Sequence, residues 1–194
     1  ILLRRRCHRP TAYIVSAGRR RAAIRASKCV PRARLHRRGT VRLGLKRGSS
    51  TVTRDGTLDA PRLIDYARVI AALRDAGHSV VLVSSGAVAA GRALMRAHTS
   101  DPAVIGKQML AAIGQPRLMA LYGELFGHYG MTVAQVLLTR ADLDDRRRYL
   151  NARNTFEAML AAGVLPIVNE NDTVATEEIR VGDNDQLSAL VSSL

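Results

Sequence analysis

The chain has 194 residues, 47% of them apolar, which is enough for one globular domain with a sizeable core. No stretch approaches the roughly 18 consecutive apolar residues that a membrane-spanning helix needs. The formal charge of +14 is typical of proteins that bind nucleic acid or membrane surfaces, but residues 1–54 hold 17 of the 30 Lys and Arg and no Asp or Glu. The remaining residues carry 13 basic and 16 acidic groups, so the positive charge belongs to the head of the chain.

Residues 1–39 form a basic head with three Arg clusters and no hydrophobic period, so we do not expect it to pack a core. Three interpretations are open: a disordered nucleic-acid-binding arm, an organellar transit peptide, or spurious coding sequence ahead of the true start. The chain begins with Ile, which favours the third. Both cysteines, Cys7 and Cys29, lie in this head, so residues 40–194 hold no disulfide, as expected for a reducing, cytoplasmic compartment.

From residue 40 onward, strand patterns alternate with helix patterns. Strands are predicted at 41–45, 80–83, 133–138 and 164–168, with a small hairpin at 173–182. Helices are predicted at 59–77, at 105–129 with a break near Gly114 and Pro116, at 146–162 and at 186–194. Such alternation predicts an α/β fold with a mainly parallel sheet and helices on both faces, formed by residues 40–194.

Polar and small residues gather where the predicted strands end. Residues 169–172 follow one strand, 182–185 precede the last helix, and Gly48-Ser49 and Ser84-Ser85-Gly86 follow two other strands. Ligands bind at the carboxyl ends of strands in open α/β sheets, and glycine-rich loops let an anion such as phosphate approach backbone amides. The sequence therefore predicts an active site here. A loop rich in Asn and Asp only for its turns is the alternative.

Several other kinds of site are not indicated. The sequence has no P-loop motif, no G-x-G-x-x-G dinucleotide motif and no G-x-S-x-G nucleophile elbow. The histidines of the globular part, His78, His98 and His128, are isolated in sequence and show no ligand spacing. No metal-ligand set is therefore predicted among the side chains of this chain.

Five motifs stand in a characteristic order: SSGAVAAG at 84–91, KQ and GQ at 107–108 and 114–115, QVLLT at 135–139, NAR at 151–153, and NEND with GDND at 169–172 and 182–185. In this order and spacing they resemble the glutamate 5-kinases, over a stretch from about residue 46 to the last residue. The resemblance implies the amino-acid-kinase fold, a three-layer αβα sandwich. It also implies ATP-dependent phosphorylation of the side-chain carboxylate of L-glutamate, the first step of proline biosynthesis.

The resemblance, carried over residue by residue, assigns three residues to the substrate. Ser85, Asp172 and Asn184 would bind L-glutamate. The physics agrees, because Asp172 can pair with the substrate's ammonium, while Ser85 and Asn184 can donate hydrogen bonds to a carboxylate. The resemblance further implies proline as a feedback inhibitor and a homo-oligomer in the full-length enzyme.

The same resemblance implies which residues would contact ATP and act in the transfer of its phosphoryl group. Lys46, with Gly48 and Ser49, would contact ATP, and Asp185 would organise the catalytic lysines. Phosphoryl transfer needs alignment and positive charge on the transferring group, which Lys46 and Mg²⁺ would supply. Lys46 and Asp185 are therefore the expected catalytic residues.

The chain departs from the family's pattern in two places. Arg42, Gly44 and Arg47 interrupt a first strand that in the family is a run of β-branched residues, and an unpaired buried Arg costs several kcal/mol. We therefore expect that strand to be shortened, displaced or frayed. After Asp185 the family's nucleotide-binding region, second catalytic lysine and PUA domain are missing, so we expect an incomplete domain with negligible kinase activity.

Other functions remain open. One is another kinase of the same fold, such as acetylglutamate kinase, although the motifs at 169–172 and 182–185 argue against it. Another is a non-catalytic module that binds glutamate or proline. Specific nucleic-acid binding through the head is disfavoured, because aromatic residues do not interleave with its basic ones.

Removal of residues 1–39 is expected to leave L-glutamate affinity unchanged. The segment cannot recover its ordering cost, roughly 1–2 kcal/mol per residue for the backbone alone. Calorimetry and amide exchange on the whole chain and on a chain that starts at Thr40 test this. Any nucleic-acid binding by the head should collapse as salt rises. Strong exchange protection within residues 1–39, or glutamate affinity lost on their removal, would show that the head belongs to the fold.

Overall fold

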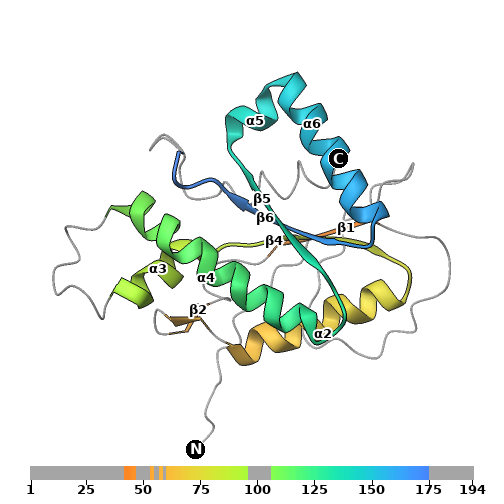
Figure 1. The fold of residues 1–194 in the computed structure, drawn as a ribbon, viewed down its shortest axis with the longest axis horizontal. Helices are drawn as coiled ribbons and strands as arrows, with labels where there is room; N and C mark the ends of the chain where they lie inside the picture. Colours follow the sequence, from red (N-terminus) through yellow and green to blue (C-terminus); the bar gives the residue numbers. More distant parts are fainter. Residues whose placement is uncertain (1–41, 47–52, 55–56, 59, 96–105, 175–194) are drawn as a thin grey trace, which may run out of the picture.

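The computed structural model describes residues 42–46, 53–54, 57–58, 60–95 and 106–174 (Figure 1). In chain order its elements are β1 (Arg42–Lys46), β2 (Thr53–Arg54), β3 (Thr57–Leu58), α2 (Ala60–Asp75), β4 (Ser79–Val83), α3 (Ala87–Met95), α4 (Lys107–Gly127), β5 (Val133–Leu138), α5 (Arg140–Asp144), α6 (Arg146–Ala161) and β6 (Leu165–Glu170). Within these ranges, no helix combines the length and the apolar character that crossing a membrane requires.

Four strands form one parallel sheet in the order β1-β4-β6-β5. Where β1 pairs with β4, the last residues Lys46 and Val83 are aligned. Where β5 pairs with β6, the last residues Leu138 and Glu170 are aligned. All four carboxyl ends therefore lie along one edge, as the α/β prediction requires. The short strands β2 and β3 pair antiparallel in a separate hairpin.

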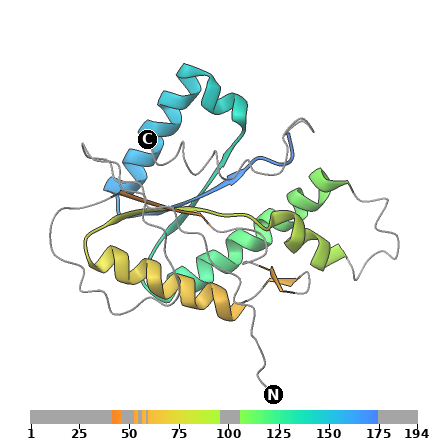
Figure 2. The same cartoon turned by 180° about the vertical axis from the view of Figure 1, so that it is seen from behind.

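The sheet is buried on both faces, which confirms the predicted three-layer αβα arrangement. Alternate residues of β4 enter different cores: Val80 and Leu82 pack with α2 and α4, while Val81 and Val83 pack with α6. Figures 1 and 2 show α2, α3 and α4 on one side of the sheet and α5 and α6 on the other. Strands covered on both faces explain the apolar runs in β4 and β6.

The predicted break in the long helix is wrong. α4 runs without interruption from Lys107 to Gly127, with Pro116 inside it. Proline removes one hydrogen bond and crowds the preceding turn. Both halves are nevertheless packed: before the proline, Leu110 is buried where α4 meets α3, and after it Leu118 and Tyr122 pack in the core against the sheet.

The prediction for the first strand is also corrected. β1 is neither displaced nor shorter than its neighbour, because all five of its residues align with the five residues of β4. Gly44 and Leu45 are buried in the interior of the strand, while the basic residues Arg42 and Lys46 stand at its two ends. Arg47 lies outside the described residues, as do the predicted helix at 186–194 and most of the hairpin predicted at 173–182.

The sequence patterns missed four elements: the strands β2 and β3 of the hairpin, and the helices α3 and α5. They also placed the end of β6 too early: Asn169 and Glu170, expected in a loop, pair with Leu137 and Leu138 of β5. The remaining strands and helices agree with the prediction to within a few residues. β6 continues to Glu170, and the Asn171 amide still donates to the carbonyl oxygen of Leu138 on β5, so among the described residues only 172–174 have left the sheet.

α3 and α4 pack closely because two glycines meet. A Cβ added at Gly114 would lie under 3.0 Å from the carbonyl oxygen of Ala87 and from the amide nitrogen of Gly91. A Cβ at Gly91 would meet the carbonyl oxygen of Leu110 in the same way. Only hydrogen at both positions allows this approach.

The turn from β5 into α5 is fixed by a capping box. The amide and the hydroxyl of Thr139 both donate to the Asp142 carboxylate, at 2.8 and 2.6 Å, and the Asp142 amide donates back to the hydroxyl. The two bonds from Thr139 hold the pKa of Asp142 below its usual value, and the bond from the hydroxyl has the larger effect. Arg148 lowers this pKa further. Burial opposes the shift but does not cancel it.

Gly114→Ala is expected to destabilise the chain by about 3 kcal/mol or more, because the new methyl group meets backbone and the helices must separate. Urea unfolding measures the change. Gly123→Ala is the matched control on the same helix, since its nearest contact would be ordinary, at 4.0 Å from Val133. The control should gain roughly 0.5–1 kcal/mol from helix propensity. Equal changes in the two variants would contradict the close contact.

Asp142→Asn is expected to cost about 1 kcal/mol at pH 7, because a neutral acceptor replaces a charged one. A carboxylate with a lowered folded pKa stabilises above its unfolded pKa of about 3.9 and loses that contribution as the pH falls through the folded value. The difference between variant and parent should therefore shrink as the pH falls below about 4, toward the lowered folded pKa. Urea unfolding at pH 7 and at a series of pH values below 4 measures it. Asp144→Asn is the control, since its pair with Arg140 is exposed.

Candidate functional site

The carboxyl ends of the four parallel strands define the edge where the site lies. After β4, the Ser84 amide donates to the carbonyl oxygen of Val168 at 2.7 Å, and the Ser84 hydroxyl lies 2.8 Å from the Tyr122 hydroxyl. Ser85 follows, and Gly86, with a φ of 111°, turns the chain into α3. This left-handed conformation disfavours residues with a Cβ, which explains the glycine.

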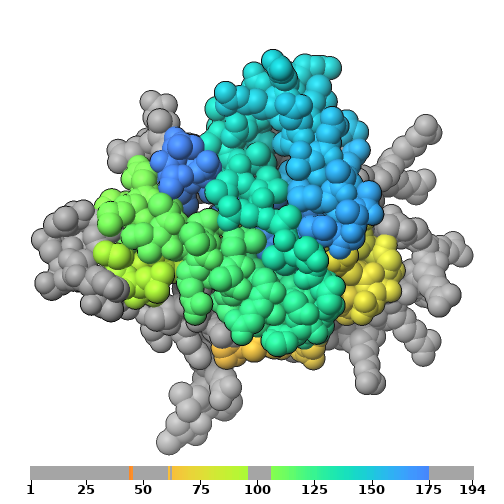
Figure 3. Space-filling view, in the orientation of Figure 1, coloured from red at the N-terminus to blue at the C-terminus, as the bar shows by residue number. Residues whose placement is uncertain are grey.

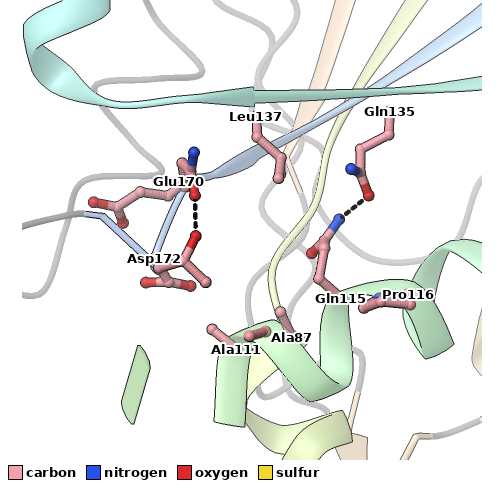
Figure 4. Close-up of a pocket in the computed structure, with 11 residues that line it drawn as sticks. Ala87, Ala111, Gln115, Pro116, Gln135, Leu137, Glu170 and Asp172 are labelled. Carbon is pink, nitrogen blue, oxygen red and sulfur yellow. Dashed lines mark hydrogen bonds between the residues drawn. The ribbon is translucent and has the colours of Figure 1, made fainter. Parts of the chain in front are cut away.

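A pocket of about 280 Å³ opens at this edge, between α3, α4, β5 and the residues that follow β6 (Figure 4). On the surface in Figure 3, the end of β6, in blue, lies beside α4, in green. The lining residues are Ala87, Ala111, Ala112, Gln115, Pro116, Gln135, Leu137, Glu170, Asn171, Asp172 and Thr173. The volume lies just below the range of about 300–1,000 Å³ that is usual for drug-sized ligands, so a smaller molecule fits it.

Three carboxamides are joined across the inner part of the site. Asn169 Nδ2 donates to Gln115 Oε1 at 2.9 Å, and Gln115 Nε2 donates to Gln135 Oε1 at 2.9 Å. Asn169 and Gln115 are buried, with 2% and 8% of their surface exposed, whereas Gln135 is exposed. The bonds join α4 to β6 and β5, so the buried polar groups are satisfied inside an otherwise apolar layer.

An acidic side chain lies at the other end of the pocket. Asp172 follows β6 in a turn that is closed by a bond from the Val174 amide to the Asn171 carbonyl oxygen. Its carboxylate lies 3.5 Å from Lys107 Nζ, and its side chain is 14% exposed against 67% for Lys107. An ion pair with one partner in water contributes little to stability, so Lys107 can leave at small cost.

Of the predicted site residues, the structure describes Lys46, Ser85 and Asp172. Asp172 lines the pocket, whereas Ser85 is half-buried at the same edge and is not among the lining residues. Lys46 ends β1, and its backbone aligns with Val83, close in sequence to Ser84 and Ser85. Gly48, Ser49, Asn184 and Asp185 lie outside the described residues.

The sequence motifs GQ at 114–115 and QVLLT at 135–139 contain Gln115 and Gln135, but neither glutamine was predicted to have a role. Their apolar surroundings in the sequence could have indicated one. Gln115 lies in a helix among Ala, Ile and Leu, and Gln135 interrupts the apolar strand Val133–Leu138. A carboxamide in such surroundings needs a partner, because a buried amide without one costs free energy.

This arrangement can recognise a small molecule that carries charges of both signs. Asp172 and Glu170 are the carboxylates of the lining, while its carboxamides and Thr173 offer hydrogen-bonding groups in a pocket with alanine walls. In the described part of the chain, no three His, Cys, Asp or Glu side chains lie together as metal ligands would. The described part of the pocket thus combines carboxylates with neutral hydrogen-bonding groups.

Comparison with known proteins gives a consistent result. A family model described as the amino acid kinase family matches residues 45–194. The chain is similar to the glutamate 5-kinases of Herpetosiphon aurantiacus (58% identical over 156 residues, 79% of this chain and 42% of the relative), Vibrio parahaemolyticus (54% over 152 residues, 77% and 40%) and Thermus thermophilus (54% over 153 residues, 79% and 41%).

The chain spans about two fifths of the length of these curated relatives. Among solved structures, an aspartate kinase from Synechocystis is similar with a TM-score of 0.37 and 18% sequence identity. That match covers 66% of this chain and 20% of the other.

Proposed function

The chain belongs to the amino acid kinase family, and from this premise we propose that its protein transfers a phosphoryl group from ATP to the side-chain carboxylate of L-glutamate. The relatives that are 54–58% identical to it carry the name glutamate 5-kinase. The observation that carries the proposal is Asp172, a carboxylate at the end of a small pocket on the carboxyl edge of the sheet. The product would be glutamyl 5-phosphate, which enters proline biosynthesis.

In the proposed complex, the substrate's ammonium pairs with Asp172. Lys107 already places an ammonium 3.5 Å from this carboxylate, which supports a cationic ligand at the same place. Since the Lys107 side chain is 67% exposed, its head returns to water when the substrate arrives. Ser85 and Asn184 are proposed to donate to the substrate's α-carboxylate.

The phosphate groups are proposed to lie at the end of β1. ATP with Mg²⁺ supplies the phosphoryl group and part of the charge that stabilises its transfer. Lys46 ends β1 on the same edge as the pocket, and the small residues Gly48 and Ser49 follow it in sequence. A lysine followed by small residues is suited to phosphate oxygens, and this supports placing the nucleotide's phosphates there. Asp185 is proposed to orient the lysines that face the transferring group.

Three further properties belong to the proposal. Proline, which shares the ammonium and α-carboxylate of glutamate, would compete for Asp172 and inhibit the enzyme. We expect the complete protein to form a homo-oligomer. We place the reaction in the cytoplasm, because both cysteines lie outside residues 40–194 and the proposed domain needs no disulfide.

Asp172→Ala is expected to weaken L-glutamate binding by about 2 kcal/mol or more, roughly 30-fold, because it leaves the substrate's ammonium unpaired. Calorimetry on the 194-residue chain measures the affinity. N-acetyl-L-glutamate, which has no ammonium, should be insensitive to the substitution, and this separates the proposal from an acetylglutamate kinase.

Asp144→Ala is the matched control, since it removes an exposed carboxylate that pairs with Arg140 on α5. It should leave the affinity unchanged. Equal affinity of the parent and Asp172→Ala for L-glutamate would refute the assignment of the ammonium site.

A further inference from the structure

Two carboxamides of the pocket lining, Gln115 and Gln135, are linked with the buried Asn169 in one direction. Asn169 donates to Gln115, and Gln115 donates to Gln135, in both cases at 2.9 Å. A carboxamide has one donor end and one acceptor end. If Gln115 alone turned over, its oxygen would face the oxygen of Gln135 and its nitrogen would face the nitrogen of Asn169. The three groups therefore turn together or not at all.

The hydrogen bond from Gln115 determines which end of the Gln135 carboxamide faces the pocket. Its oxygen is engaged with Gln115, so its amide nitrogen is on the other side. Figure 4 shows that nitrogen turned away from Gln115 and toward Leu137, another lining residue. The side chain is exposed, whereas that of Gln115 is buried. Gln135 thus offers N–H donors at the opposite end of the pocket from Asp172.

We propose that Gln115 is a positioning residue that sets substrate selection: it holds Gln135 with its donors toward the pocket, and this orientation favours a ligand with a side-chain carboxylate over one with a carboxamide. The inference rests on the proposed binding of L-glutamate. N–H donors bond an anionic carboxylate about twice as strongly as a neutral amide oxygen. A Gln135 turned by 180° would offer its oxygen, which repels a carboxylate and accepts from a carboxamide.

Gln115→Glu reverses the direction of the hydrogen bond to Gln135 and hardly changes the size of the side chain. A glutamate at this position has no donor, so it accepts from Asn169 as before and also accepts from the nitrogen of Gln135. Gln135 then presents its oxygen to the pocket. The affinity ratio of L-glutamate to L-glutamine should fall at least tenfold, with glutamine binding retained or improved.

Calorimetry with both amino acids, on the 194-residue chain and on Gln115→Glu, measures this ratio. Gln108→Glu is the control: it adds the same charge to α4 at an exposed position outside the pocket lining, and its ratio should match the parent's. A purely structural role for Gln115 would weaken both ligands equally and leave the ratio unchanged, and that result would overturn the inference.

The buried carboxylate of Gln115→Glu can prevent folding, and thermal unfolding would reveal this. A second variant keeps the inference testable in that case. Gln115→Met keeps the length of the side chain and leaves Gln135 unheld, so the preference for L-glutamate should fall without reversing. A Met variant that keeps the full preference would overturn the inference while leaving the proposed function intact. If the parent chain binds neither amino acid, the proposed function and this inference both fail.

Discussion

The contact of α3 and α4 at Gly91 and Gly114 is the constraint on which the site depends. It brings the two helix backbones together without side chains between them, and the residues beside it form one wall of the pocket: Ala87 on α3, and Ala111 and Gln115 on α4. Gln115 directly follows Gly114. A wider helix spacing would therefore move the carboxamide that joins β5 to β6, and two sides of the pocket would change together.

The pocket separates two kinds of recognition. At one end, the mostly buried Asp172 pairs with Lys107, whose side chain is largely in water, and our proposal replaces this lysine with the substrate's ammonium. The inner part uses neutral carboxamides, which are satisfied by one another and cost little to bury. A charged group in the same inner position would need a partner of its own. The carboxamide network therefore adds no charge to the inner part of the site.

The parallel sheet explains why both parts face the same edge. β4, β5 and β6 all end there, and the turns that follow them supply Ser84 with Ser85, Thr139 with its cap, and residues 171–173. Lys46 at the end of β1 reaches the same edge, which in our proposal sets the phosphate side of the reaction next to the amino-acid side. Phosphoryl transfer depends on such alignment more than on any single side chain.

The sequence alone determined the α/β class, most of the strand and helix positions, and Asp172 in the pocket, because apolar periodicity and strand-end polarity are local signals. It failed for α4, where tertiary packing holds a helix through Pro116, and for the end of β6, where pairing with β5 extends the strand over Asn169 and Glu170. Only the tertiary structure decided that Gln115, Gln135 and Asn169 form one network. Those residues are 20 and 54 positions apart, and hydrogen-bond direction is a property of contacts that no sequence spacing encodes.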